Sequence, residues 1–461
     1  MRIRDKTVVL LMIEEMRNSV GEGWVVTEKE KIEGYMHDEC ARGVIPTASE
    51  AIVVKPANAE EIAGIMRIAS ANRVPVYPRG GGTGLVGGAV PTRKGIVLSL
   101  ERMRGIDVDE KNMMCTAEAG VTLAQLEEEV DRHDLFFPPH PGDEGAQVGG
   151  LVACNAGGSR AVKYGVMRNY VKGLELVLAD GSVLSLGGKL LKNNTGYDLM
   201  DLFIGSEGTL GIVTKVILKL YPKPGSSATL IIPFGSEREA IEAVSVILHN
   251  DIAPLALEYV ENAWVCASAE HLSLKWPCEG EKAQLMLIIS ENSEENVYAE
   301  CERVNELFSD RAIYMAERRE DQENILKIRS NIYTALKEHI LDTLDISVPP
   351  AEIGRMIASV HTVEEENNTT MPVYGHAADG NLHIHIMDDA EERFHEIKES
   401  MYAMAHELGG VITAEHGIGK ARVKDMKKFM DKKELELMKS IKRALDSENI
   451  MNPETLIGDD A

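Results

Sequence analysis

Three glycine-rich segments, each next to strand-like sequence, constrain the fold of this chain most. The first, residues 79–88 (RGGGTGLVGG), has six glycines in ten positions directly after the strand-like residues 73–78; the others are residues 147–158 and 205–213. Because glycine has no Cβ, many backbone N–H groups in such a loop can point at one anion. A pyrophosphate is the natural occupant of the first loop, and three such loops could wrap a long cofactor.

The first loop contains the spacing of a dinucleotide fingerprint without its context. Gly82, Gly84 and Gly87 match G-x-G-x-x-G, but the following residues 89–92 (AVPT) show no opening helix, so a Rossmann unit is not predicted. A plain glycine-rich turn is the alternative for this loop taken alone. The two later glycine clusters favour a cofactor site instead.

The first half reads as an α+β domain rich in loops. Strands are expected at residues 73–78, 95–100, 171–178 and 211–220, and helices at 59–71, with Asn58 as N-cap, and at 122–133. Residues 221–227 contain two prolines, a glycine and two serines, a composition typical of a domain boundary.

A second domain is expected after this boundary, because 461 residues exceed the roughly 250 to 300 that one core usually supports. Its expected strands are residues 228–233, 284–290, 371–375 and 381–387. Its expected helices are residues 238–250, 293–309 and 321–341, followed by a final amphipathic helix at 431–448.

The charge balance excludes some partners. Lys and Arg number 49 against 74 Asp and Glu, a net charge of −25, which repels nucleic acid and anionic lipid. An anionic substrate therefore needs local positive charge at its site. The six cysteines are scattered without a C-x-x-C pair, which indicates a reducing compartment and no iron–sulfur cluster. The apolar run at residues 8–13 is too short for a membrane span, so we expect a cytosolic amphipathic helix there.

Residues 373–386 contain three histidines in a predicted β-hairpin. Asp379 and Gly380 separate two β-like runs, a strong hairpin signal. If these two residues form the turn, His376 lies directly opposite His383, with Cβ atoms about 4.5 to 5.5 Å apart, close enough to hold one ion. His385 lies further along the same face.

Glu415 and His416, in the glycine-flanked segment AEHGIG, add a further ligand. Two histidines and one carboxylate leave open positions for substrate, as catalytic Zn²⁺ or Fe²⁺/Mn²⁺ sites do. The alternative for the hairpin alone is a set of hydrogen-bonded polar histidines without a metal.

The glycine-rich half resembles the FAD domain of the vanillyl-alcohol-oxidase/PCMH flavoprotein family. The motifs that carry this resemblance are PxxPRGGGTG (75–84), PPHPG (138–142), GGxxxxNAGG (149–158), KYG (163–165), GYD (196–198) and GSEGTLG (205–211). The first loop carries Thr83 and lacks the histidine that links flavin covalently in some members, so non-covalent FAD is implied. The implied cofactor-binding residues are Pro78, Arg79, Gly80, Gly81, Gly82, Thr83, Gly84, Leu85, Pro141, Gly142, Val148, Gly149, Gly150, Asn155, Gly158, Tyr164, Gly165, Glu207, Gly208, Gly211, Ile212 and Asn452.

The second half resembles the C-terminal domain of FAD-linked D-lactate, glycolate and D-2-hydroxyglutarate dehydrogenases. The shared motifs are GHxxDGNLH (375–383) and AEHGIG (414–419). The resemblance implies that His376, His383 and Glu415 bind a divalent metal, zinc or iron/manganese, and that His416 is the catalytic base beside the flavin.

The same resemblance implies a fold and substrate-binding residues. Arg329 and His385 would bind the substrate, although a solvated helix arginine is the alternative for Arg329. The fold would be α+β: a PCMH-type FAD-binding domain with an N-terminal helical lead-in, a cap domain with an antiparallel sheet and the metal site, and a C-terminal helical segment that returns to the FAD domain. The implied ranges are 1–224 with a lead-in to about 45, 225–425, and 426–461.

The implied reaction is oxidation of a small D-2-hydroxy acid to the 2-oxo acid. The metal would polarise the substrate hydroxyl, His416 would take its proton, and hydride would pass from C2 to FAD. Hydroxyglutarate-type members usually carry a lysine just before Asp345, where this chain has Thr343 and Leu344, so D-lactate or glycolate is favoured over D-2-hydroxyglutarate. Alternatives of other classes are a non-redox transferase of the alkyl-glycerone-phosphate synthase type and a non-catalytic flavin subunit.

The expected partners follow from this reaction. With no cluster of its own, the chain would pass electrons to an external acceptor: a quinone, a cytochrome, an electron-transfer flavoprotein or an iron–sulfur subunit. We expect no nucleic acid, no transmembrane segment, a homodimer, and a location in the cytoplasm or at the membrane periphery.

Overall fold

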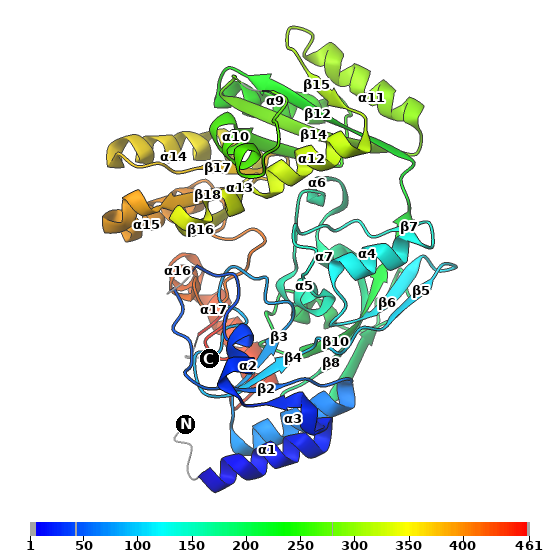
Figure 1. The fold of residues 1–461 in the computed structure, drawn as a ribbon, viewed down its shortest axis with the longest axis vertical. Coiled ribbons are helices and arrows are strands. Elements are labelled where there is room, and N and C mark those ends of the chain that lie inside the picture. Colours follow the sequence, from blue (N-terminus) through cyan, green and yellow to red (C-terminus); the bar gives the residue numbers. More distant parts are fainter. Residues whose placement is uncertain (1–5, 42–43, 279, 459–461) are drawn as a thin grey trace.

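The computed structural model describes residues 6–41, 44–278 and 280–458. Two regions stand one above the other in Figure 1, the N-terminal half below and a large sheet with its helices above. The chain passes between them near residue 225, directly before strand β12 (Ser226–Phe234).

The lower region contains two main sheets. The first has the order β1 (Val25–Val26), β2 (Ile52–Val54), β4 (Ile96–Ser99) and β3 (Val76–Arg79), with β2, β4 and β3 parallel. The second is antiparallel, with the order β5 (Ile106–Asp109), β6 (Met114–Glu118), β10 (Ile212–Lys219), β8 (Val171–Val177) and β9 (Val183–Gly187). A small ribbon pairs β7 (Leu135–Phe136) with β11 (Tyr221–Pro222).

Helices surround these sheets. They are α1 (Lys6–Val20), α2 (Lys29–Ile32), α3 (Ala59–Asn72), α4 (Leu123–Asp131), α5 (Val148–Cys154), α6 (Ala161–Tyr164), α7 (Met167–Tyr170) and α8 (Met200–Phe203). The predicted N-cap of α3 is confirmed, because the Asn58 side chain accepts a hydrogen bond from the Glu61 backbone N–H at 2.9 Å. Helix α4 begins with a reciprocal capping box between Thr122 and Gln125.

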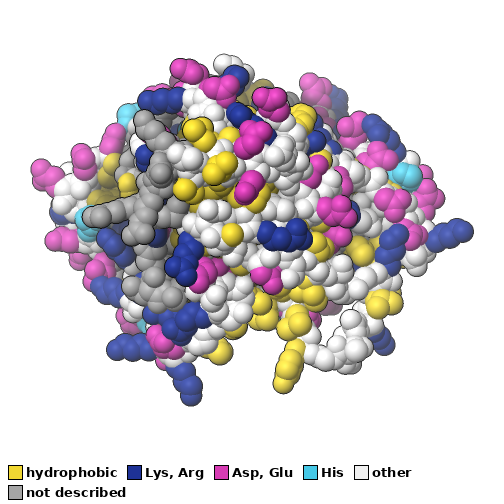
Figure 2. All heavy atoms as spheres, turned by 90° about the horizontal axis from the view of Figure 1, so that it is seen from below, with side chains coloured by type: hydrophobic (Ala, Val, Ile, Leu, Met, Phe, Trp, Pro, Cys, Tyr) yellow, Lys and Arg dark blue, Asp and Glu magenta, His cyan; other side chains and the backbone are white. Residues whose placement is uncertain are grey.

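Helix α1 is amphipathic, as predicted. Met12 and Met16 are buried towards α3, while Leu10 and Leu11 are 65% and 61% exposed. Figure 2 views the molecule from the end that α1 occupies in Figure 1, and there acidic and basic side chains are interspersed, with hydrophobic ones between them. Among the described residues, no helix is both long enough and apolar enough to cross a membrane.

The upper region is a seven-stranded antiparallel sheet, which we call the cap sheet. Its order is β15 (Tyr314–Ala316), β12, β14 (Ala283–Glu291), β13 (Ala256–Glu261), β17 (Val373–His376), β18 (Asn381–Met387) and β16 (Ile340–Ser347). Its helices are α9 (Glu237–His249), α10 (Asn262–His271), α11 (Glu294–Leu307), α12 (Arg319–Ser330), α13 (Ile332–Leu336), α14 (Ile353–Asn367) and α15 (Phe394–Glu407).

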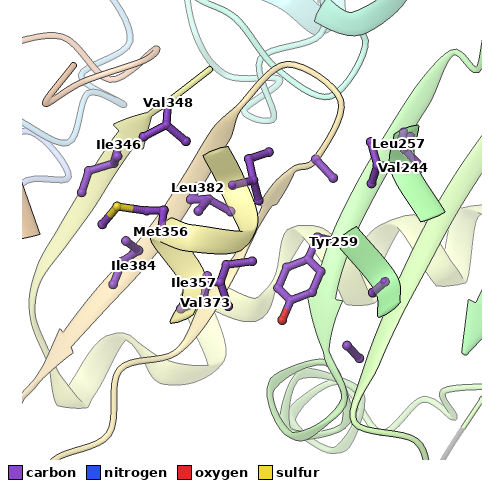
Figure 3. Close-up of a cluster of buried hydrophobic side chains, with 14 of the residues drawn as sticks. Val244, Leu257, Tyr259, Ile346, Val348, Met356, Ile357, Val373, Leu382 and Ile384 are labelled. Atoms are coloured by element: carbon purple, nitrogen blue, oxygen red, sulfur yellow. The ribbon is translucent and has the colours of Figure 1, made fainter. Parts of the chain in front are cut away.

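The two faces of the cap sheet differ in polarity because side chains alternate along each strand. One face packs Leu257, Val373, Leu382 and Ile384 against helices such as α14, as Figure 3 shows. The opposite face carries the polar partners of this pattern, Glu258, His376, Asn381, His383, His385, Thr343 and Asp345. A one-residue slip would exchange the faces, so the apolar core fixes which side chains reach the site.

The predicted two-residue turn at Asp379 and Gly380 is wrong. In the observed register His376 pairs with Asn381, and Tyr374 pairs with His383, so the turn spans residues 377–380. The backbone N–H of Ala377 donates to Leu257 on β13 at 3.0 Å, which draws this end of β17 towards β13. The shift is two residues, an even number, so His376 and His383 still share one face.

The predicted helix at residues 321–341 is too long. Helix α12 ends at Ser330, α13 covers Ile332–Leu336, and β16 begins at Ile340. The Asn331 side chain donates to the Lys327 carbonyl at 2.9 Å and ends α12, and the chain then pairs with β18.

The C-terminal segment returns to the lower region, as predicted. It contains α16 (Val423–Phe429) and α17 (Lys432–Leu445). The buried Lys442 Nζ donates to the Thr209 carbonyl at 2.8 Å, and Asn452 Nδ2 donates to the carbonyls of Gly88 and Glu207 at 3.0 and 2.8 Å. These bonds join the chain end to two of the glycine-rich loops.

Candidate active site

A cleft of about 1580 Å³ separates the glycine-rich loops from the polar face of the cap sheet. Both predicted halves of the site reach it: the loops around Gly81, Gly142 and Gly208 on one wall, and His376 and Glu415 on the other. Most of the predicted site residues line this cleft. Five do not: Val148, Asn155, Tyr164, Gly165 and His385.

The glycine loops leave room for a cofactor close to the backbone. Gly150 lines the cleft, and a Cβ added there would meet no protein atom within 4 Å, so the space beside its backbone is open. Gln147 Oε1 and Asp38 Oδ2 are buried on the same wall without a hydrogen-bond partner. Since buried polar atoms are normally satisfied, these two atoms fit a bound polar ligand such as FAD.

Some residues predicted to bind the cofactor use their side chains elsewhere. The Arg79 guanidinium donates to the carbonyls of His37 and Gly34 at 2.6 and 3.0 Å. Asn155 ends α5 with φ of +51° and accepts from the Arg168 backbone N–H at 3.0 Å. Tyr164 packs against Phe136. Their side chains therefore shape the loops.

Glu207 joins the two halves of the site. Its carboxylate accepts from the backbone N–H groups of Ile418 and Gly419 at 2.9 and 2.7 Å. This contact holds the AEHGIG segment against the glycine loops. The approach is close, because a Cβ added at Gly157 would lie only 2.9 Å from Glu415 Oε2.

Two matched alanine substitutions test whether the glycine-rich loops bind FAD. Gly149 has no room for a side chain, because an added Cβ would lie 2.7 Å from the Cβ of Ala119. Gly150, in contrast, faces the cleft. We expect Gly150→Ala to leave the unfolding temperature of the FAD-free protein unchanged or raised, since alanine gains about 1 kcal/mol over glycine in a helix. Its FAD affinity should fall at least about tenfold, or roughly 1.4 kcal/mol. Gly149→Ala should instead lower the unfolding temperature, and unchanged FAD binding by Gly150→Ala would contradict the assignment.

Three imidazoles surround one carboxylate oxygen. Glu415 Oε1 lies 3.8 Å from His376 Nε2, 3.6 Å from His383 Nε2 and 3.8 Å from His416 Nε2. Ligand atoms about 2.0 to 2.2 Å from a tetrahedral ion lie roughly 3.4 Å from one another. The distances from Oε1 to His376 Nε2 and His383 Nε2 therefore each fit a pair of ligands that share one divalent metal.

Asp345 lies behind this group and contacts it, and it is a site residue that sequence reasoning missed. Its Oδ2 accepts from the backbone N–H groups of Ala414, Glu415 and His416 at 3.0, 2.8 and 2.7 Å. It also lies 3.9 Å from His416 Nδ1, and its Oδ1 lies 3.7 Å from His383 Nδ1. In the described chain Asp345, His383, Glu415 and His416 each offer a ligand atom within 4.8 Å of the others, a set that contains two of the predicted ligands, His383 and Glu415, but not His376.

The buried histidines differ in their environment. Burial lowers the pKa of His383 to about 3, so its imidazole is neutral and able to bind a metal. His385 also has a pKa lowered by burial, to about 3. Its Nδ1 and Nε2 lie 2.9 Å from the hydroxyls of Thr343 and Tyr374, so His385 can reach a substrate only through a neighbour.

Arg329 is not a solvated helix arginine, so that alternative is wrong. Its side chain is 11% exposed, its Nη2 lies 2.5 Å from Glu258 Oε2, and its guanidinium lies over the Tyr374 ring at 4.7 Å. Its Nε is buried without an acceptor while the residue lines the cleft. A substrate carboxylate would satisfy this donor.

Glu258 is the second site residue that sequence reasoning missed. Burial raises the pKa of this carboxyl, but His376 and Arg329 outweigh burial and hold it at about 2. The carboxylate is therefore charged, and it faces both His376 Nδ1 and the Arg329 guanidinium.

Comparison with known proteins supports one family. Residues 50–187 match the "FAD binding domain" family, and residues 223–456 match "FAD linked oxidases, C-terminal domain". A D-lactate dehydrogenase of Archaeoglobus fulgidus is 41% identical over 91% of this chain and 95% of the relative. The glycolate oxidase subunit GlcD of Bacillus subtilis is 35% identical over 89% of both chains.

Solved structures share the fold at lower identity. p-Cresol methylhydroxylase superposes with a TM-score of 0.79 at 17% identity, covering 99% of this chain and 98% of that one. Alkyldihydroxyacetonephosphate synthase superposes with a TM-score of 0.75 at 18% identity, covering 98% and 86%. These two likenesses show the fold alone. The family matches and the relatives show that the chain belongs to the FAD-linked oxidases, and it shares the fold of p-cresol methylhydroxylase (PCMH).

Proposed function

We propose that this protein oxidises a small D-2-hydroxy acid, D-lactate or glycolate, to the 2-oxo acid with non-covalent FAD. The observation that carries the proposal is the cluster of His376, His383, Glu415 and His416, which faces the glycine-lined cleft beside Arg329. Relatives named D-lactate dehydrogenase and glycolate oxidase subunit, at 41% and 35% identity, support the same substrate class.

The proposed roles follow from the contacts. FAD would supply the redox chemistry when bound, and a divalent metal, zinc or iron/manganese, would polarise the substrate oxygens. Arg329 Nε donates to the substrate carboxylate. His416 accepts the hydroxyl proton at Nε2, the ring nitrogen nearer Glu415.

The metal ligands we propose are His376, His383 and Glu415. Asp345 also lies within reach, but its oxygens accept five hydrogen bonds, from Asn381, Thr413 and three backbone N–H groups. A carboxylate so occupied is better suited to orient His383 and His416 than to bind an ion.

The cleft favours a monocarboxylate. Just before Asp345, where hydroxyglutarate-type members usually carry a lysine, this chain has Thr343 and Leu344. Thr343 lines the cleft, and its hydroxyl lies 2.9 Å from His385 Nδ1. Lys337 also lines the cleft, but its Nζ lies 2.6 Å from Glu39. These two positions thus offer little charge for a second substrate carboxylate.

Anaerobic titration of the flavin tests the proposal. D-Lactate or glycolate should bleach the oxidised-flavin absorbance, whereas L-lactate, D-malate and D-2-hydroxyglutarate should do so weakly or not at all. Metal analysis of the same sample should find about one divalent ion per chain. No bleaching by any acid would instead favour a non-redox transferase or a non-catalytic flavin subunit, and preferential bleaching by D-2-hydroxyglutarate would overturn the choice of substrate.

We further propose that the reduced flavin passes its electrons to an external acceptor, a quinone, a cytochrome, an electron-transfer flavoprotein or an iron–sulfur subunit. The scattered cysteines support this, since they offer no cluster spacing. We also propose domain limits of 1–224, 225–425 and 426–461, which the start of the cap sheet at Ser226 supports.

A further inference from the structure

We propose that Glu258 is a positioning residue that couples the metal site to the substrate-binding arginine. The inference rests on the proposed function, because it assumes that His376 binds a metal and that Arg329 binds the substrate carboxylate. Glu258 itself would touch neither metal nor substrate.

The geometry of the carboxylate carries this inference. Glu258 Oε1 lies 2.6 Å from His376 Nδ1, and Oε2 lies 2.5 Å from Arg329 Nη2. One rigid planar group therefore holds both side chains at once. The Glu258 side chain is 1% exposed at the wall of the cleft, so little water competes for either bond.

The strand fixes Glu258 in place. It lies in β13, the middle strand of the cap sheet, where it pairs with His376 on one side and with Met286 on the other. Met286 is 1% exposed and offers no hydrogen-bond donor, so the carboxylate turns to His376 and Arg329.

Each bond has a consequence for the site. The bond at His376 Nδ1 turns the ring so that Nε2 faces Glu415, the orientation that a metal ligand needs. The bond at Arg329 Nη2 leaves Nε, which has no protein acceptor, for the substrate. Removing the carboxylate should therefore loosen metal binding and substrate binding together.

The competing explanation is a purely structural role, in which Glu258 only neutralises a buried arginine. That role predicts lower stability for Glu258→Gln, with unchanged metal affinity and KM in the protein that folds. Glu261→Gln is the matched control, because Glu261 lies in the same strand, is 9% exposed, and contacts Trp264 instead of the cleft.

The experiment compares Glu258→Gln, Glu261→Gln and the unaltered holoenzyme. Retention of the bound metal is measured by competition with EDTA and elemental analysis, and kcat and KM for D-lactate are measured with a dye acceptor. We expect Glu258→Gln to lose metal affinity by about 10- to 100-fold. We also expect its KM to rise at least about tenfold more than that of Glu261→Gln.

Two further variants cover failure to fold. Glu258→Asp keeps the charge on a shorter side chain and should fall between the unaltered protein and Glu258→Gln in both measurements. The double variant Glu258→Gln with Arg329→Met removes the stranded cation, so metal retention can be measured without it.

The outcomes separate this inference from the proposed function. Metal affinity and KM within about twofold of the Glu261→Gln values would overturn it. A loss in only one of the two would also overturn the coupling and leave Glu258 as the partner of a single residue. If the unaltered protein oxidises no hydroxy acid, the proposed function fails, while the metal measurement still tests Glu258.

Discussion

Replacing His416 with asparagine should lower the rate of flavin reduction by D-lactate about 10²- to 10⁴-fold, the usual contribution of a positioned base. His416 lines the cleft, and its Nε2 lies 3.8 Å from Glu415 Oε1. Asparagine keeps a polar side chain but cannot take the hydroxyl proton. The FAD content should stay unchanged, because no glycine-loop contact is lost. Anaerobic stopped-flow absorbance measures the rate, and the flavin spectrum measures occupancy.

His361→Asn is the control for this substitution. His361 lies on α14, on the far side of the cap sheet, where its Nδ1 lies 2.6 Å from Glu364. Its replacement should change the rate of flavin reduction by less than about tenfold. A His416→Asn protein that keeps most of its rate would show that the base is another residue.

The part of the site that the sequence predicts is the part encoded locally. Glycines at residues 80–84 and 149–150 leave a backbone without side-chain obstruction, which is visible in the residue pattern before any fold is known. The close spacing of His376, His383 and His385 likewise places them on one face of the hairpin, and a register shift of two residues does not change this. The predicted length of the hairpin turn is wrong, but the prediction that these histidines share one face of the sheet is correct.

The supporting residues depend on contacts between distant segments. Glu258 meets His376 across 118 positions and Arg329 across 71, and Asp345 meets His416 across 71. In sequence, Glu258 is one acid in the run ALEYVE, and nothing local distinguishes it from Glu261 on the opposite face. Burial and strand pairing make that distinction, and both are properties of the assembled sheet.

Substituting glutamine for Glu415 should strip the metal from the site and lower turnover at least as far as His416→Asn does. Glu415 Oε1 is the atom to which the Nε2 atoms of His376, His383 and His416 are all close. Glutamine has nearly the same shape but no charge, so an ion would lose its anionic ligand. We expect less than about a tenth of the metal content of the unaltered protein, with FAD retained.

Metal removal and two further substitutions complete this test. EDTA treatment of the unaltered protein should abolish turnover, and added Zn²⁺ or Mn²⁺ should restore it, whereas Glu415→Gln should not recover.

His376→Asn should lose metal as Glu415→Gln does. Asp345→Asn should keep metal with affinity lowered about 10- to 100-fold, because it removes only the group that orients the ligands. If Asp345→Asn lost the metal entirely while His376→Asn kept it, the ion would sit among Asp345, His383, Glu415 and His416, and His416 could not act as the free base.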